Sequence, residues 1–249
     1  MLELKPDIAF KEELMTLTGA PLNTCMQCGT CSVVCRLSPD VRPFPRKEML
    51  YAGWGAADKL IADPDVWLCH QCGDCTESCP RGVNPSDVLA GVRQLTYRKY
   101  ARPAFLGKLL SRPSMLPIAL LLPVLIIMAI IYLAGTLRIP EGPVNYSLFF
   151  PHGWLNSSFT LITLGSYTVA AIGWSRFWKD LGVSFPGNTA PKGFFRSFWK
   201  VKNDILAHSR FNKCETSGGR KIAHFLVFYG FVLLLLVTLY AIYAAVTDQ

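Results

Sequence analysis

Three long apolar stretches lie in the second half of the chain, over residues 115–137, 154–174 and 222–246, with polar segments between them. An α-helix rises about 1.5 Å per residue, so each stretch is long enough to cross the roughly 30 Å hydrocarbon core of a bilayer. Serine, threonine and glycine give the second stretch a small, weakly polar side that suits close packing. The pattern predicts three membrane-spanning helices, the first of them kinked at Pro123.

The first hundred residues carry shorter apolar runs that glycine and proline interrupt, which predicts several short helices. Residues 1–20 are expected to form one helix, whose apolar side carries three residues: Ile8, Leu14 and Leu17. A second helix is expected to continue to about Ile61. A third should begin with Pro85, behind the capping residue Asn84, and reach about Tyr100.

These patterns predict an all-α protein with two parts. Residues 1–100 form a helical domain, residues 101–114 a basic linker, and residues 115–249 a membrane domain of three helices. An apolar content of 51% with only 17% charged residues supports the membrane domain. No apolar signal region follows the start of the chain, so the first domain is expected in the cytoplasm.

Basic residues orient the predicted helices. Residues 93–112 hold six basic residues and no acid, which indicates a lipid-facing anchor: Arg93, Arg98, Lys99, Arg102, Lys108 and Arg112. The loop after the first stretch has only Arg138, whereas the loop after the second has ten basic residues: Arg176, Lys179, Lys192, Arg196, Lys200, Lys202, Arg210, Lys213, Arg220 and Lys221. The positive-inside rule therefore places the first domain and the second loop on the cytoplasmic side of the inner membrane, with residues 138–153 outside.

The net charge of +8 favours membrane lipid over nucleic acid as the partner, because the basic residues lie beside apolar stretches instead of forming one patch with stacking aromatics. Within the second loop, six apolar residues alternate with lysine and arginine: Phe194, Phe195, Phe198, Trp199, Ile205 and Leu206. This alternation predicts an amphipathic helix that lies in the headgroup plane.

Eight of the nine cysteines form two runs with the same spacing, and only Cys214 lies elsewhere. The runs are Cys25-x2-Cys28-x2-Cys31-x3-Cys35 and Cys69-x2-Cys72-x2-Cys75-x3-Cys79. In two-cluster ferredoxins the first three cysteines of a run hold one [4Fe–4S] cluster and the fourth holds the other. The spacing thus predicts one cluster on Cys25, Cys28, Cys31 and Cys79, and a second on Cys69, Cys72, Cys75 and Cys35.

Two other uses of these cysteines fit the pattern less well. A zinc site needs four ligands and leaves the third step of each run unexplained. Disulfides are disfavoured, because a cysteine at every third residue pairs poorly within its own run. Thiolates that hold iron also imply a reducing compartment.

The chain has four histidines, which are candidates for haem ligation or for polar anchoring at the membrane interface. His70 follows Cys69 and is expected to donate a hydrogen bond near the second cluster. His152, His208 and His224 are the haem candidates, although His152 and His224 are expected at opposite faces of the membrane and so cannot share one haem.

Several segments resemble a known family. Residues 23–31 (NTCMQCGTC), 44–49 (FPRKEM) and 67–75 (WLCHQCGDC) resemble the C-type iron–sulfur subunit of heterodisulfide reductase. The continuation into residues 208–211 (HSRF), Cys214 and 224–231 (HFLVFYGF) resembles the membrane subunit of the quinone-interacting membrane-bound oxidoreductase complex.

The resemblance implies that electrons pass between menaquinone, one or two haems b, the two clusters and soluble flavin- and iron–sulfur-containing subunits, which serve adenylylsulfate reductase in sulfur metabolism. Tyr229 and Trp154 are candidates for quinone contact. Two features depart from the family: its membrane part has more spans and histidines, and Arg36 follows Cys35 where proline is usual.

The predicted protein carries electrons and has no bond-making site of its own, since no dinucleotide loop, nucleophile–base pair or phosphate cradle is recognisable. One alternative is a membrane subunit that delivers electrons to a disulfide-reducing catalytic subunit of a heterodisulfide-reductase-like complex. A second alternative is a membrane scaffold whose clusters are purely structural.

Overall fold

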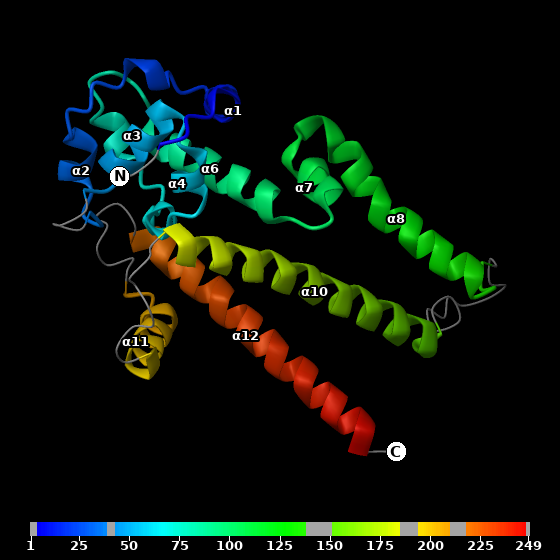
Figure 1. The fold of residues 1–249 in the computed structure, drawn as a ribbon. Coiled ribbons are helices and arrows are strands. Elements are labelled where there is room, and N and C mark those ends of the chain that lie inside the picture. The colour runs from blue at the N-terminus through cyan, green and yellow to red at the C-terminus, as the bar shows by residue number, and fades with distance from the viewer. Residues whose placement is uncertain (1–3, 39–42, 138–150, 185–193, 210–217, 248–249) are drawn as a thin grey trace.

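The computed structural model describes residues 4–38, 43–137, 151–184, 194–209 and 218–247. Within these ranges every regular element is a helix and none is a strand (Figure 1). The elements of the N-terminal domain are α1 (Ile8–Thr18), η1 (Leu22–Thr24), α2 (Thr30–Val34), α3 (Arg46–Trp54), α4 (Ala57–Ile61), η2 (Pro64–Leu68), α5 (Asp74–Glu77) and α6 (Pro85–Tyr100). They are followed by α7 (Ala104–Ser111), η3 (Pro113–Met115), α8 (Leu116–Leu133), α10 (His152–Ser184), α11 (Phe194–Ala207) and α12 (Gly218–Thr247).

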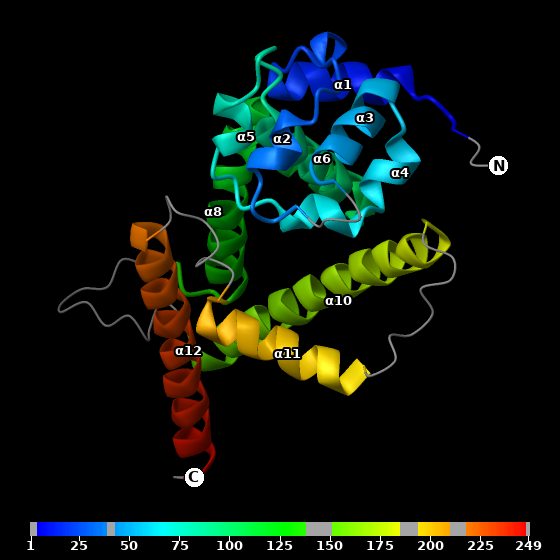
Figure 2. The same cartoon turned by 90° about the vertical axis from the view of Figure 1, so that its left-hand side faces the viewer.

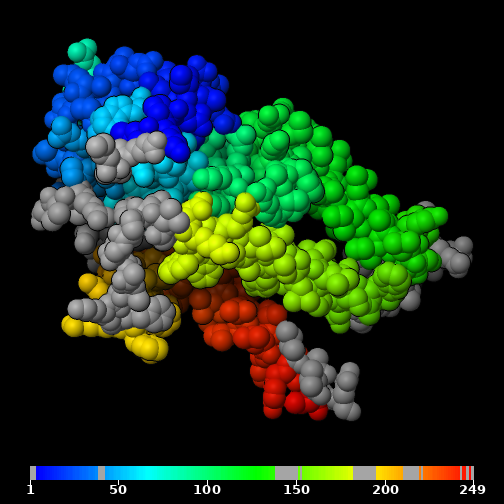
Figure 3. Space-filling view, viewed as in Figure 1, coloured from blue at the N-terminus to red at the C-terminus, as the bar shows by residue number. Residues whose placement is uncertain are grey.

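Helix α6 is the centre of the N-terminal domain, and α1, α3, α4 and α5 all contact it. Its inner face buries Val88, Leu89 and Val92 against the other helices. Gly91 lets α1 approach closely, because a Cβ at this position would lie 2.4 Å from Cγ2 of Thr18. Figure 3 shows the result as one lobe, coloured blue to teal, with the green segment that contains α8 extending to its right.

The predicted helices of the first hundred residues need three corrections. The helix expected to continue to Ile61 is two helices, because Gly55 (φ 65°) ends α3 and a Cβ there would lie 2.5 Å from the Asp7 carbonyl oxygen. In α1 the residues that face the core are Phe10 and Leu14, whereas Ile8 is 70% exposed. Helix α6 begins at Pro85 as predicted, but Asn84 has a left-handed backbone and its side chain makes no capping hydrogen bond.

Two helical segments are long and apolar enough to cross a membrane, judged by length and composition. They span Pro113–Leu133 and Lys221–Ala241, each 21 residues long, with mean hydropathies of 2.8 and 2.5. No part of either segment is buried inside the protein, so neither is the core helix of a soluble domain. Pro123 lies inside α8, and the kink predicted there stays a prediction.

The prediction of three spans is corrected to two. Residues 154–174 are helical, as expected, but they form part of a 33-residue helix, α10, that does not qualify as a candidate span. The reason lies in its serines and threonines, which lower its hydropathy and bond to the helix's own carbonyls, as Ser166 does to Ile162 at 2.8 Å.

The C-terminal part of α10 instead packs on the N-terminal domain (Figures 1 and 2). The Tyr100 hydroxyl donates to Asp180 at 2.7 Å. The Phe177 ring lies 5.5 Å from that of Tyr100 and 6.4 Å from that of Trp67, between centroids. This contact fixes α6, and the cysteine run behind Trp67, to the helices that follow.

The predicted basic anchor over residues 93–112 is divided between two roles. Arg98 forms an ion pair with Glu13, and Lys99 lies 3.7 Å from Asp180, so both face acids within the protein. Arg102 and Lys108 are exposed and remain placed to meet lipid headgroups.

A candidate site for two iron–sulfur clusters

The two cysteine runs fold in the same way. In each run the residue before the second cysteine has a positive φ, 57° at both Gln27 and Gln71. The glycine after that cysteine is also left-handed, with φ 84° at Gly29 and 93° at Gly73. A short helix then begins, α2 in the first run and α5 in the second, and these two helices contact each other. This repeated path turns the thiols of each run towards one point.

Each of two cavities is lined by four thiols that come from both runs. The first is lined by Cys25, Cys28, Cys31 and Cys79, and has an empty volume of about 400 Å³. The second is lined by Cys35, Cys69, Cys72 and Cys75, and has an empty volume of about 350 Å³. These are the two sets that the spacing grouped together, and two cavities of similar size suit the same kind of occupant. That the thiols ligate clusters stays a prediction.

Burial affects the protonation of two of the thiols. Burial raises the pKa of Cys75 to about 12 and that of Cys31 to about 11, so these thiols hold their protons at neutral pH until a metal displaces them. None of the eight thiols forms a disulfide in the part of the chain that the structure describes. Four converging sulfurs at each cavity are the donor set that [4Fe–4S] clusters use.

The two thiol sets differ in how far they are exposed to solvent. Cys28 is exposed, and the Thr30 hydroxyl, 3.3 Å from its Sγ, lowers the pKa of this thiol. Cys75 is only 8% exposed. The first cavity therefore opens towards solvent, whereas the second lies deeper in the domain.

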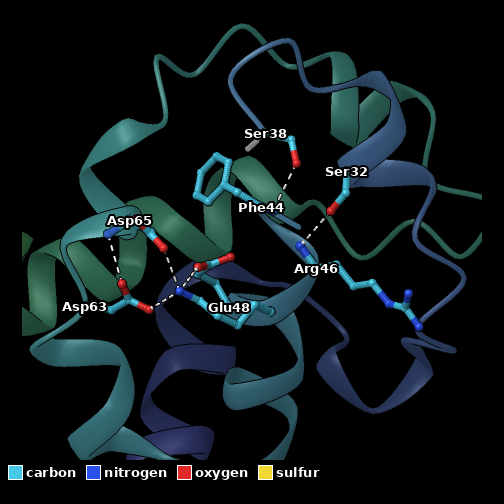
Figure 4. A network of polar contacts seen from close by, with 8 residues as sticks. Ser32, Ser38, Phe44, Arg46, Glu48, Asp63 and Asp65 are labelled. Carbon is cyan, nitrogen blue, oxygen red and sulfur yellow. Dashed lines mark hydrogen bonds and ion pairs between the residues drawn. The ribbon is translucent and has the colours of Figure 1, made fainter. Parts of the chain in front are cut away.

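The start of α3 and the two residues before it lie next to the two cavities. The Arg46 amide donates to the Ser32 hydroxyl at 3.1 Å, and the Phe44 amide donates to the Ser38 hydroxyl at the same distance (Figure 4). These bonds tie the first run to the start of α3. Arg46 lines the first cavity and Phe44 the second.

An acidic cluster then joins α3 to the segment before the second run. The carboxylates of Glu48, Asp63 and Asp65 lie close enough together to hold a metal ion (Figure 4). The ammonium of Lys47 already lies among them. Its Nζ lies 2.7 Å from Asp65, 2.8 Å from Asp63 and 3.1 Å from Glu48. The lysine charge thus occupies the centre of this cluster and connects α3 to η2, just before Cys69.

Peptide and side-chain donors reach the sulfurs. The Val83 amide donates to Sγ of Cys79 and the Gln71 amide to Sγ of Cys69, both at 3.4 Å. Arg93 turns inwards from α6, where its Nη1 donates to the Cys69 carbonyl oxygen at 3.3 Å. The sequence pattern assigned Arg93 to a lipid-facing group, and nothing in the local pattern indicated this contact.

A third cavity lies between the N-terminal domain and the last helices, with an empty volume of about 800 Å³. Its lining residues come from the second cysteine run, α11, the residue after α11, and α12: His70, Val201, Asp204, Ile205, His208, His224 and Phe228. His70 also lines the second cysteine cavity, so this residue lies between the two spaces. This arrangement places the third cavity next to the second thiol set.

Two of the three haem candidates meet at this cavity. Nε2 of His208 lies 2.8 Å from Nδ1 of His224, a hydrogen-bond distance, and His208 is only 4% exposed. The sequence did not predict this pair, because His208 follows α11 and His224 lies in α12. Local sequence patterns do not show which residues of two separate helical segments meet. The side chain of His152 lies outside the described residues, as does Cys214.

The two quinone candidates lie apart. The Tyr229 ring packs 6.4 Å from that of His208, between centroids, and its hydroxyl donates to the Leu206 carbonyl oxygen at 2.9 Å. Trp154 lies at the N-terminal end of α10, away from the end that packs on the N-terminal domain. At a rise of about 1.5 Å per residue, it is about 35 Å along the helix from Phe177. Only Tyr229 is next to the third cavity.

Comparison with known proteins places the cysteine runs in a family. Residues 21–83 match the 4Fe-4S dicluster domain. A protein of Archaeoglobus profundus that is named as similar to the C-type subunit of heterodisulfide reductase is 37% identical over 100 residues, which are 40% of this chain and 52% of the relative. The C-type subunit of the H(2):CoB-CoM heterodisulfide,ferredoxin reductase of Methanothermobacter marburgensis is 38% identical over 86 residues, 33% of this chain and 45% of the relative.

A third relative matches more of the chain at lower identity. Citrate utilization protein B of Escherichia coli is 27% identical over 177 residues, which are 66% of this chain and 43% of that protein. The chain thus spans about half the length of the relatives it matches. Its dicluster domain is homologous to the C-type subunit of heterodisulfide reductases.

Proposed function

We propose that this chain, which contains a 4Fe-4S dicluster domain, is a membrane-anchored subunit that carries electrons through two [4Fe–4S] clusters. The observation that carries the proposal is the pair of cavities, each lined by four thiols drawn from both runs. When bound, the clusters supply one-electron chemistry. The protein's own residues hold the clusters, donate hydrogen bonds to the sulfurs and set the charge around them.

The third cavity is the proposed place where electrons enter from, or leave to, a quinone such as menaquinone. His70 separates this cavity from the second thiol set, which gives the quinone a short path to a cluster. The hydrogen-bonded pair of His208 and His224 offers a polar contact to a quinone oxygen, and Asp204 beside it offers a proton acceptor. Phe228 provides an apolar wall.

Haem b is implied by the resemblance to the quinone-interacting complex. The histidine pair as it lies does not fit the two axial positions of one haem, because each metal–nitrogen bond is about 2 Å and the two nitrogens would have to be about 4 Å apart. Haem b on His152, His208 or His224 stays a prediction. Sharp absorption bands in the visible spectrum of the reduced protein would reveal it.

Soluble flavin- and iron–sulfur-containing subunits are the proposed partners, with adenylylsulfate reductase served through them. The two candidate spans support an inner-membrane location, and the basic residues Arg102 and Lys108 beside the first span favour the cytoplasmic side for the clusters. The match to the 4Fe-4S dicluster domain, over residues 21–83, supports the cluster part of this proposal.

A pair of cysteine variants tests the proposal. Cys72→Ser should remove the second cluster and abolish quinol-dependent reduction of the first. Cys214→Ser, outside both runs, is the matched control and should retain both clusters. The measurements are iron and acid-labile sulfide content and electron paramagnetic resonance of membranes reduced with a quinol. Zinc in place of iron, or full turnover in the Cys72 variant, would refute the proposal.

A second candidate is a subunit that passes electrons to a disulfide-reducing catalytic subunit. It is favoured by the relatives, several of which are subunits of heterodisulfide reductases. Affinity purification of the complex separates the two, since the first predicts flavoprotein subunits and the second a cysteine-rich catalytic subunit. Clusters that stay oxidised with quinol and with every partner would instead indicate a structural scaffold.

A further inference from the structure

The surface over the first cavity combines an exposed thiol with an exposed apolar side chain. Cys28 is exposed, and Met26, which lines the same cavity, is 55% exposed. A flexible, polarisable methionine next to a redox ligand suits a surface that packs against a partner. The second thiol set differs, because Cys75 there is buried.

The charged residues around this cavity are all positive. Among the described residues that line it, only Arg46 and Arg81 carry charge, and none is acidic. Both arginines are exposed. The Arg46 side chain lies over Gly29, at 3.7 Å from the position of a Cβ there, and Nε of Arg81 lies 3.3 Å from Sδ of Met26. The two guanidinium groups therefore border the thiol set instead of pointing away from it.

We propose that these four residues form a docking face for an acidic redox protein: Met26, Cys28, Arg46 and Arg81. A negative surface on the partner complements the two arginines, and an apolar centre covers Met26 as the proteins meet. This inference rests on the proposed function and deepens it by giving the chemistry of the partner.

The position of the docking face favours a soluble protein over lipid. Pro85, at the start of α6, lines the first cavity, whereas Tyr100, at its end, contacts α10. A helix of this length separates the two by about 22 Å. The face therefore lies at the end of α6 opposite its contact with α10 and its continuation through α7 into α8, which contains the first candidate span. Electrons can then enter or leave through the third cavity, next to the second thiol set, and through the docking face at the first thiol set.

A charge-removal variant tests the docking face. The probe is an acidic flavodoxin in its hydroquinone state, mixed with the oxidised full-length protein in detergent and followed by stopped-flow absorbance. The flavin is oxidised by one electron as one cluster is reduced by one. At low ionic strength Arg46→Gln/Arg81→Gln should slow this reaction about tenfold, and the fall of the wild-type rate with added salt should largely vanish.

Matched variants separate charge from folding. Arg102→Gln/Lys108→Gln removes the same charge beyond the other end of α6 and should react like the wild type. Arg46→Lys/Arg81→Lys keeps the charge and should keep most of the rate. Dithionite, a small reductant, should reduce the clusters of every variant.

The outcomes are distinguishable. Equal rates and equal salt dependence in the glutamine and wild-type proteins would overturn the docking face. It would also be overturned if the wild-type clusters accepted electrons from dithionite but not from flavodoxin. A wild-type protein that assembles no clusters would overturn the proposed function itself. A lysine variant as slow as the glutamine variant, with its clusters intact, would also contradict a role for charge.

Discussion

The two thiol sets have the same backbone path and different surroundings. Both runs repeat the left-handed glutamine and glycine that turn the cysteines inwards. The first set opens to solvent beside Arg46 and Arg81, whereas the second contains the buried Cys75 and borders His70 and the third cavity. The comparison teaches that a cysteine motif determines which thiols converge, while side chains from distant helices determine what each site can exchange electrons with.

The largest expected effect comes from removing a buried ligand. Cys75→Ser should eliminate the second cluster and half of the bound iron, because its buried position gives a substitute ligand or solvent no access. Cys28→Ser should retain part of the first cluster, since an exposed site admits water or hydroxide as a replacement ligand. Iron content and paramagnetic resonance of both variants measure the difference. Equal loss in the two variants would show that burial does not distinguish the sites.

A change of charge should affect the two sites separately. Arg93→Gln should lower the reduction potential of the second cluster by tens of millivolts, because it removes a positive charge next to Cys69 that favours the more negative, reduced state. The first cluster should be unchanged. Arg93→Lys should restore most of the potential, whereas a role in packing alone would leave the lysine variant as altered as the glutamine variant. A redox titration followed by paramagnetic resonance gives both potentials.

The acidic cluster between the two sites should make stability depend on pH. Burial raises the pKa of Glu48 from 4.5 to about 7. The native state therefore keeps a proton that the unfolded state has lost, and its stability should fall as pH rises from about 4.5 to about 7, by about 3 kcal/mol. In Glu48→Gln this fall should disappear. Thermal unfolding of the full-length protein in detergent across this pH range is the measurement, and an unchanged profile would contradict the assignment.

Much of the site follows from local sequence, and the rest does not. Cysteine spacing alone grouped the thiols into the two sets that line the cavities, because ligand spacing is a local property. The start of α6 at Pro85 was likewise predictable from the helix-start preference of proline. The left-handed Gln27 and Gln71 were not, since glutamine carries no such preference.

The missed features all depend on tertiary contacts. The basic neighbours of Arg93 suggested a lipid anchor, but this residue points to Cys69, which is 24 residues earlier in the chain. The pairing of His208 with His224 depends on how α11 and α12 pack, which periodicity does not reveal. The break at Gly55 arises where Asp7 crosses the chain, so a helix predicted from local pattern was too long.

The smallest expected effect tests whether the two runs are equivalent in their backbone. Gly29→Ala and Gly73→Ala each place a Cβ at positive φ, 84° and 93°, which should cost about 1 kcal/mol. Space does not separate them, because the nearest atoms to a Cβ at Gly29 are 3.7 Å away on Arg46 and none lies within 4 Å at Gly73. Both variants should therefore lower the unfolding temperature by a similar few degrees. A much larger loss of stability at one glycine would mean that contacts around that glycine, and not its backbone angle, determine the loss.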